Sequence, residues 1–145
     1  MTGLKVARHS LSLSTQIRRQ FFDLTSPVRE QVARAEVADG LVVVNTLHTT
    51  CCLLVNEFQG ALVDDLTRLM ERLVADDGGY KHNDPRYSDC ERRNADSHLR
   101  GMVLGQSLCL QVRNSAVLLG TWQSIILAEL DGPRSRSMSV QVTGI

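Results

Sequence analysis

The sequence has few aromatic residues, no excess of either charge and no long apolar stretch. Aromatic residues make up 4% of the 145 residues, and 16 basic side chains balance 16 acidic ones. A nucleic-acid-binding protein usually has a basic patch or stripe, and single-strand binders add aromatic platforms for base stacking. We therefore expect no nucleic-acid partner.

Long apolar segments are also missing. Nothing approaches the ~20 apolar residues of a membrane-spanning helix, and the first ten residues, MTGLKVARHS, lack the apolar core of a secretory signal. We expect a cytoplasmic protein with no membrane partner. The four cysteines, at positions 51, 52, 90 and 109, are then expected to be thiols, and none has the C-x-x-C spacing of a redox dithiol or a zinc ribbon.

The patterns that are present predict a single α+β domain over residues 1–145, with a mostly antiparallel, sandwich-like sheet and helices packed on one side. The expected strands cover 6–15, 20–24, 41–47, 51–55, 107–112, 116–130 and 137–145. The expected helices cover 26–40, 61–74 and 94–105. The helix over 61–74 has the clearest period, with apolar residues on one face and charged residues opposite.

Local signals refine these elements. Segment 20–24 is expected to form a hairpin with the first strand, and Ser26 followed by Pro27 predicts a helix start. Asn94 is expected to cap the helix that ends at Gly105. The polar segment 75–93, nineteen residues long, has no clear element, and loops of this length in a compact domain tend to be functional or disordered.

Three of the four histidines have polar surroundings. His48, His82 and His98 lie at element ends or among polar residues, whereas His9 lies in the first expected strand and is interpreted as structural. Three histidines and a water make an open zinc site of catalytic type. However, spacings of 34 and 16 residues match no local zinc motif, so separate capping or surface histidines are the alternative.

The segment LHTTCC, residues 47–52, places two cysteines next to each other. Neighbouring residues on a strand point to opposite faces, and a disulfide between adjacent cysteines is strained. We interpret Cys51 and Cys52 as small buried thiols. A soft metal would be the alternative if either of them faced His48.

Three further segments have the residue types of a phosphate site. In GTWQS, Gly120 and Thr121 can present an N–H and a hydroxyl to phosphate, or the glycine can simply relieve a bend. In LDGPRSR, Asp131 and Arg134 flank a turn, and the planar arginine fork suits phosphate, although a solvated turn has the same composition. Glu57 either belongs to a helix-entry turn or orients a histidine ligand.

Five blocks occur together and in one order: HTTCCLLVNE, YKHND, NADSHLRGMVLG, GTWQSIILAELDGPR and the closing strand. In this combination the chain resembles the YjbQ family, also called the UPF0047 family, some of whose members are described as secondary thiamine-phosphate synthases. The resemblance covers nearly the whole chain and is strongest from Leu41 onward. GTWQ followed by DGPR is its most specific pair.

The resemblance implies an α+β fold around a β-sandwich, assembled as a homotrimer. It also implies a divalent metal, Zn²⁺, held by His48, His82 and His98. Many relatives have alanine at the position of Cys51, so a cysteine ligand is not a general requirement.

The implied reaction joins a pyrimidinylmethyl diphosphate to a thiazole phosphate and releases diphosphate. It needs cations and N–H donors on the leaving group, for which Ser107, Thr121 and Arg134 are candidates, with Glu57 and Asp131 as supporting acids or proton acceptors. Mg²⁺ more often accompanies a diphosphate, whereas three histidines prefer zinc. Two alternatives are a zinc-dependent hydrolase and a non-catalytic zinc-binding trimer that senses or stores metal.

Overall fold

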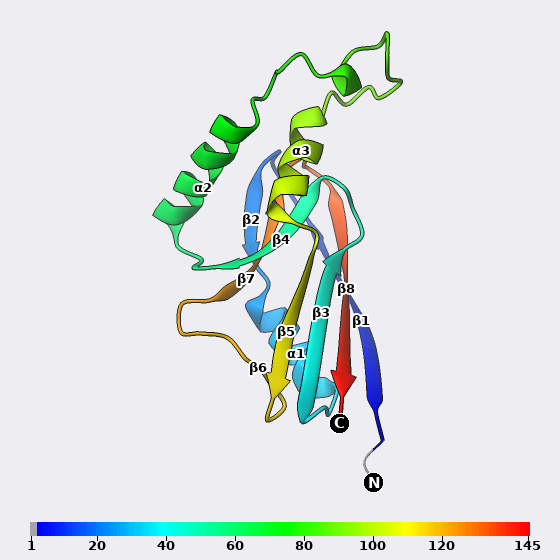
Figure 1. The fold of residues 1–145 in the computed structure, drawn as a ribbon, viewed down its shortest axis with the longest axis vertical. Coiled ribbons are helices and arrows are strands. Elements are labelled where there is room, and N and C mark those ends of the chain that lie inside the picture. The colour runs from blue at the N-terminus through cyan, green and yellow to red at the C-terminus, as the bar shows by residue number, and fades with distance from the viewer. Residues whose placement is uncertain (1–2) are drawn as a thin grey trace.

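Residues 3–145 are described by a computed structural model, in which two antiparallel sheets and three α-helices make up the fold (Figure 1). The larger sheet has the strand order β1-β8-β3-β5-β6, and the smaller has the order β2-β7-β4. The strands are β1 (Lys5–Ser14), β2 (Gln20–Asp23), β3 (Asp39–Thr46), β4 (Cys51–Asn56), β5 (Ser107–Arg113), β6 (Ala116–Val117), β7 (Ser124–Glu129) and β8 (Ser135–Gly144). The helices are α1 (Thr25–Arg34), α2 (Gly60–Leu73), α3 (Ala95–Leu104) and a short 3₁₀ helix, η1 (Lys81–Asn83).

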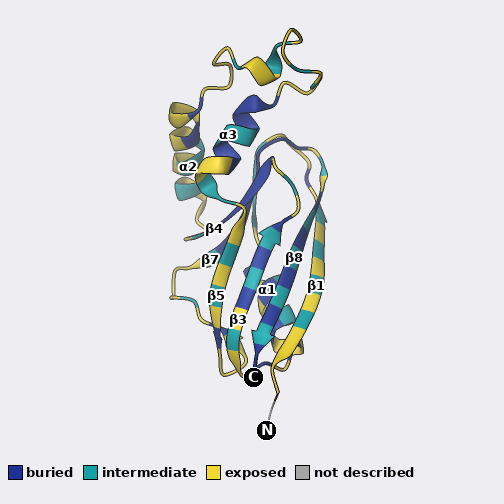
Figure 2. Ribbon diagram, turned by 45° about the vertical axis from the view of Figure 1, so that its right-hand side comes forward, coloured by how far each residue is buried: buried dark blue, intermediate teal, exposed yellow. Residues whose placement is uncertain are grey.

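The main core lies between the two sheets. β3 and β8 alternate buried with partly exposed residues, as Figure 2 shows, so each strand turns one face inward. Val42 and Val44 of β3 belong to one buried cluster with Leu53 of β4 and Leu127 of β7. The predicted sandwich-like α+β architecture is therefore confirmed. Among residues 3–145, no helix has the length and apolar character needed to span a bilayer.

The helices are divided between the sheets rather than gathered into one layer. α1 contacts β6, β8 and β7, and its Val28 and Val32 are completely buried in the main core. α3 packs against β4, and Leu104 joins a second, smaller cluster with Cys52 and Ala128. The smaller sheet is consequently covered on both faces.

This double cover explains why the predicted hairpin of 20–24 with the first strand is wrong. β2 pairs with β7 instead, with Phe22 opposite Leu127 and Phe21 opposite Ala128. Two successive phenylalanines point to opposite faces of a strand. Phe22 packs against the main core and Phe21 against the second cluster, so β2 needs a sheet with apolar cover on both faces.

The boundaries of two other predicted elements are also corrected. α1 begins at Thr25 and has no side-chain cap from Ser26; instead Asp23 Oδ1 accepts the Thr25 N–H at 2.9 Å. α1 ends at Arg34, and the expected strand over 116–130 splits into β6 and β7 around a turn. In that turn the Gln123 side chain accepts the Gly120 N–H at 2.8 Å.

Gly40 gives a direct test of the packing of the larger sheet. A Cβ atom at Gly40 would lie 2.1 Å from the carbonyl oxygen of Thr143 on the neighbouring β8. We expect Gly40→Ala to lower the free energy of unfolding by about 3 kcal/mol, because two paired strands must separate. Gly60→Ala is the control, since a Cβ there meets nothing within 4 Å. Urea denaturation of both variants checks this, and equal stability would contradict the close β3–β8 approach.

Candidate functional site

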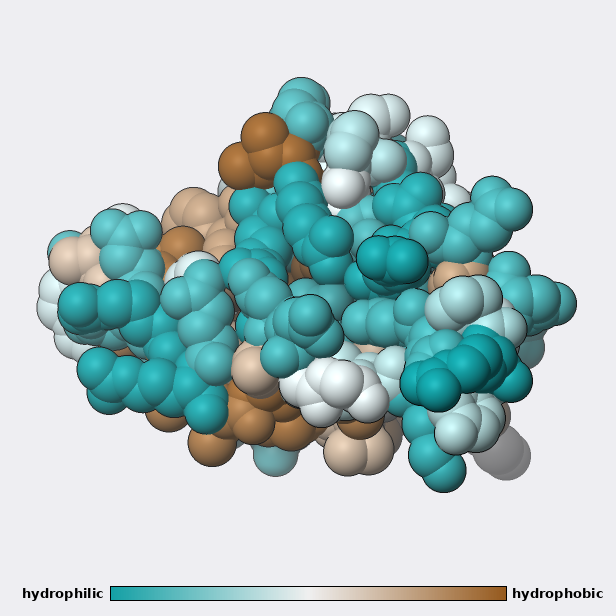
Figure 3. Space-filling view, turned by 90° about the horizontal axis from the view of Figure 1, so that it is seen from above, coloured by the Kyte–Doolittle hydropathy of each residue, from teal (hydrophilic) through white to brown (hydrophobic). Residues whose placement is uncertain are grey.

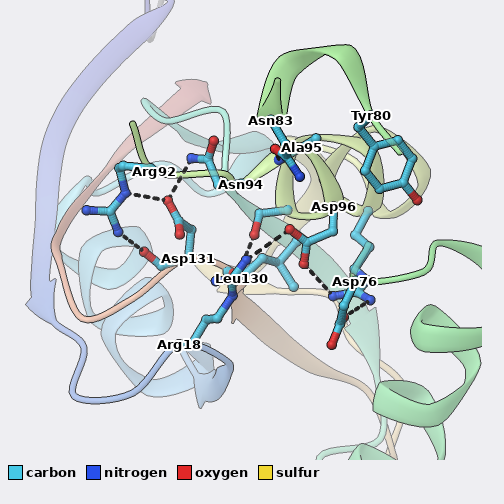
Figure 4. A network of polar contacts seen from close by, with 12 residues as sticks. Arg18, Asp76, Tyr80, Asn83, Arg92, Asn94, Ala95, Asp96, Leu130 and Asp131 are labelled. Atoms are coloured by element: carbon cyan, nitrogen blue, oxygen red, sulfur yellow. Dashed lines mark hydrogen bonds and ion pairs between the residues drawn. The ribbon is translucent and has the colours of Figure 1, made fainter. Parts of the chain in front are cut away.

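Asn94 connects two halves of a polar cluster at the N-terminal end of α3 (Figure 4). Its Nδ2 donates to Asp131 Oδ2 at 2.8 Å, and its Oδ1 lies 3.1 Å from His82 Nε2. Asn94 thus occupies the predicted N-cap position without capping, and Asn83 Oδ1 accepts the Ala95 N–H instead. Because an amide oxygen can only accept, His82 Nε2 must donate to it. The Nδ1 of a neutral His82 therefore keeps its lone pair.

His82 and His98 form a direct pair. Their ring centroids are 4.9 Å apart and the rings meet edge to face at 83°. His82 lies in η1 and His98 in the first turns of α3, so the long polar loop brings together two residues 16 positions apart. Burial, reinforced by the charge of His82, lowers the pKa of His98. A neutral imidazole at neutral pH can accept a proton or bind a cation.

Asp131 is the buried carboxylate of this cluster. Its Oδ2 accepts hydrogen bonds from Arg92 Nε at 2.9 Å and Arg134 Nη2 at 3.1 Å, as well as from Asn94. Burial raises the pKa of Asp131, but the hydrogen bonds and charges of the two arginines and the Asn94 amide outweigh it and lower the pKa below its ordinary value. Asp131 is therefore ionised at neutral pH and holds two arginines in place.

A second buried ion pair, between Glu129 and Arg136, is linked to Asp131 by a hydrogen bond. Both oxygens of Glu129 accept from Arg136, at 2.7 Å from Nε and 2.5 Å from Nη2, and Glu129 Oε1 also accepts the Asp131 N–H. Arg136 Nη2 reaches Thr50 in the loop that carries His48. The pair therefore ties the end of β7, the start of β8 and the β3–β4 loop together.

His48 is placed near this cluster but in a different role from its two partners. Ser137 N–H donates to His48 Nε2 at 2.9 Å, so the proton of a neutral ring must lie on Nδ1. Burial and the charge of Arg136 lower the pKa of His48. Its neighbour Thr49 lines one surface hollow with His98. As placed, His48 fastens its loop to β8 and offers no free lone pair.

This arrangement bears on the expected metal site. Within residues 3–145, no group of three or more histidine, cysteine, aspartate or glutamate side chains is positioned to hold a metal ion. His82 and His98 contact each other directly, whereas the Nε2 atom of His48 already accepts the Ser137 N–H. A closed three-histidine zinc site thus does not fit the residues of one chain as they lie.

The comparison with known proteins decides the family. The family model described as "UPF0047 protein YjbQ-like" matches residues 9–145. A UPF0047 protein of Archaeoglobus fulgidus is 41% identical over 90% of this chain and 97% of its own length. A UPF0047 protein of Methanothermobacter thermautotrophicus is 38% identical over 97% of this chain and 94% of its own length. The chain belongs to the UPF0047 family.

The fold comparison agrees with this assignment. The crystal structure of a YbjQ-like protein of unknown function from Sulfolobus solfataricus superposes with a TM-score of 0.92 at 29% identity, over 99% of this chain and all of the other. The resemblance drawn from the five sequence blocks is confirmed as family membership. The comparisons give this UPF0047 chain its family and its fold.

Four predicted site residues lie apart from the histidine pair in this UPF0047 chain. Glu57 follows β4, and Gly120 and Thr121 lie in the β6–β7 loop, both at mid-height on the left of Figure 1, whereas η1 and the start of α3 lie at the top. Ser107 begins β5, where it pairs with Asn45. Asp131 and Arg134 alone join the cluster, because the turn after β7 packs against α3 through the Ser97 hydroxyl, which donates to the carbonyl of Leu130.

The adjacent cysteines of the family segment LHTTCC are core thiols, as predicted. Cys51 and Cys52 are both completely buried and belong to the two different clusters on either face of the smaller sheet. The Cys51 sulfur lies 2.9 Å from Thr46 Oγ1, and burial raises the pKa of Cys52 to about 12. All four cysteines are free.

The sequence patterns missed Arg92, Asn94, Glu129 and Arg136 as members of the cluster. Glu129 and Arg136 carried a usable signal, since a charged residue within an apolar strand is rarely buried without a partner. Arg92 carried no such signal, because it stands in the irregular segment 75–93 among eight other charged residues of both signs.

Asp131 predicts a specific acid response. Because its folded pKa lies below its ordinary value of about 4, the ionised carboxylate stabilises the fold fully above that pH and this stability is lost as the pH falls through the folded value. We expect the free energy of unfolding of the wild type to fall more steeply below pH ~4 than that of Asp131→Asn. Denaturation at several pH values checks this, and parallel curves would contradict it.

Proposed function

We propose that this UPF0047 protein is a transferase of the secondary thiamine-phosphate synthase type, with its reaction centre at His82, His98, Asp131 and Arg134. It would join a pyrimidinylmethyl diphosphate to a thiazole phosphate and release diphosphate, as its main activity or as a side activity. The observation that carries the proposal is the His82–His98 pair beside a buried carboxylate that holds two arginines.

The reaction suits this cluster because it needs no strong base. The bond from the methylene carbon to the diphosphate oxygen breaks with its electron pair leaving on oxygen, and the thiazole nitrogen then supplies the pair for the new carbon–nitrogen bond. The enzyme has to stabilise the departing anion and align the two rings. Arg92 and Arg134 can stabilise the departing anion.

The two arginines have donors to spare. Each uses Nε and Nη2 on Asp131, and within residues 3–145 neither donates a hydrogen bond from Nη1. Their side chains are 47% and 33% exposed. An arginine that is anchored on a carboxylate and open to solvent on its other side loses little freedom when it binds a phosphate oxygen.

The metal and the assembly are further parts of the proposal. We propose that His82 and His98 hold a divalent cation, zinc by the nature of its imidazole ligands, with water or substrate oxygens at its other positions; Mg²⁺ would enter with the diphosphate. Bound metal would help to neutralise the charge of the leaving group.

We also propose a cytoplasmic homotrimer, in which subunit contacts would cover apolar side chains such as Leu73 and Trp122, which are 59% and 72% exposed.

The test is a condensation assay with purified protein. Wild type with the two phosphorylated substrates and zinc or magnesium should form thiamine phosphate, detected by mass spectrometry, and one diphosphate for each product. Metal analysis should give about one zinc per chain, and sedimentation should give a species three times the 16.1 kDa chain mass. Tight metal binding without any product would instead favour a metal-storage or sensor protein.

A further inference from the structure

Three arginines, Arg18, Arg19 and Arg100, surround two carboxylates near the N-terminal end of α3. Asp96, in the first turn of α3, is completely buried and accepts from Arg18 at 2.9 Å, from Arg100 at 3.0 Å and from Arg19 at 3.4 Å. Asp76, in the loop after α2, accepts from Arg100 at 2.7 Å and also from Arg19. Figure 4 shows Arg18 next to Leu130 and pointing toward Asp96, with Asp76 beyond Asp96 and with Arg92 and Asp131 on the other side of Leu130.

An open hollow lies against this network. It is lined by Ile17, Arg18, Arg19, Asp76 and Arg93. Its single carboxylate, Asp76, is already paired with Arg19 and Arg100. The end of the molecule that carries this hollow is largely hydrophilic (Figure 3). The lining therefore favours an anion over a cation or an apolar ligand.

Arg93 is the unbalanced charge of the hollow. Among residues 3–145 it has no hydrogen bond or ion pair, whereas Arg18 and Arg19 each bind a carboxylate. Its backbone has φ of +52°, in the left-handed region where glycine or asparagine is favoured over a long side chain. No contact within the described fold accounts for an arginine at this position.

We propose that the hollow formed by Arg18, Arg19 and Arg93 binds a phosphate or diphosphate group. Arg93 supplies the free guanidinium, while Arg18 and Arg19 are held in place by Asp96 and Asp76. Planar guanidiniums with fixed orientation suit phosphate oxygens. Assignment of this anion to the substrate of the enzyme rests on the proposed function; the anion site itself does not.

The position of the hollow links it to the reaction centre. Arg93 follows Arg92, which binds Asp131, and the carbonyl of Arg18 accepts the Gly132 N–H at 3.0 Å. Asp96, which holds Arg18, precedes His98 by two residues on α3. A phosphorylated substrate bound here would place its phosphate next to the Asp131 cluster.

Calorimetric titration with inorganic phosphate and with diphosphate tests the site at matched ionic strength. Wild type should bind diphosphate, Arg93→Asn should bind it about tenfold more weakly, and Arg93→Lys should lie between. Asparagine is compatible with the left-handed backbone, so Arg93→Asn should fold normally. Arg113→Gln, which removes an exposed arginine at the end of β5, is the control and should match wild type.

Each outcome of this titration decides the proposal. Equal affinity in Arg93→Asn and wild type, or no diphosphate binding by wild type, would overturn it. The condensation assay is read separately. Arg93-dependent binding without thiamine phosphate formation would support the anion site and reject the proposed reaction. Product formation without Arg93-dependent binding would support the proposed reaction and reject the anion site.

Discussion

Replacing Arg136 with methionine is expected to lower the free energy of unfolding by about 3–5 kcal/mol, because Glu129 would remain as a buried charge without its partner. Both side chains are almost completely inaccessible, at 1% and 0% exposure, and they share two hydrogen bonds. Burial raises the pKa of Glu129, but the Arg136 hydrogen bond leads a set of contacts that outweigh it and lower the pKa. Urea denaturation at neutral pH measures the loss.

Two further variants make this first prediction specific. Arg34→Met removes an exposed arginine that pairs with Glu30 across one turn of α1, and we expect a loss below about 0.5 kcal/mol. The double variant Glu129→Leu with Arg136→Met should recover most of the loss, because an apolar pair avoids the uncompensated charge. A loss below 1 kcal/mol in Arg136→Met alone would show that the pair is hydrated rather than buried.

His82→Ala and His98→Ala are each expected to slow thiamine phosphate formation about 100-fold or more, because each removes one half of the proposed reaction centre. His9→Leu is the control. His9 lies in β1, and its buried Nε2 has no hydrogen-bond partner among residues 3–145, so leucine should keep the activity and the fold. Initial rates at saturating substrate, together with thermal unfolding of each variant, separate catalysis from stability.

The account would be contradicted if His82→Ala and His98→Ala kept activity within threefold of wild type. A different result is expected for His48→Ala. Since His48 Nε2 accepts the Ser137 N–H, its loss should destabilise the β3–β4 loop. Activity lost in His48→Ala in proportion to stability alone would support the fastening role. Complete loss of metal with an unchanged fold would support the ligand role implied by the family resemblance.

Periodicity predicted the elements whose burial follows from their own sequence. The α2 helix, expected over 61–74 and found over Gly60–Leu73, and β3, expected over 41–47 and found over Asp39–Thr46, are examples. The pairing of β2 was missed because it depends on which sheet can cover both Phe21 and Phe22, a property of the assembled fold.

Prediction of the site was limited in the same way, by contacts between segments that are far apart in the sequence. Polar context singled out His48, His82 and His98, and only the family resemblance grouped them. The structure brings His82 and His98 together, whereas the environment of His48 could not be predicted, because it depends on a backbone N–H 89 residues away. Asn94 was identified as a helix cap from its position. The contacts of its amide with His82 and Asp131 require three separate segments to meet, and no local pattern specifies that.

The most direct test of the central claim is growth of a bacterial strain that lacks its own thiamine-phosphate synthase. The strain would carry wild type, His9→Leu or His82→Ala at equal expression on medium without thiamine. The account predicts growth with wild type and His9→Leu and none with His82→Ala. Equal growth with His82→Ala, or no growth with well-expressed wild type, would contradict it.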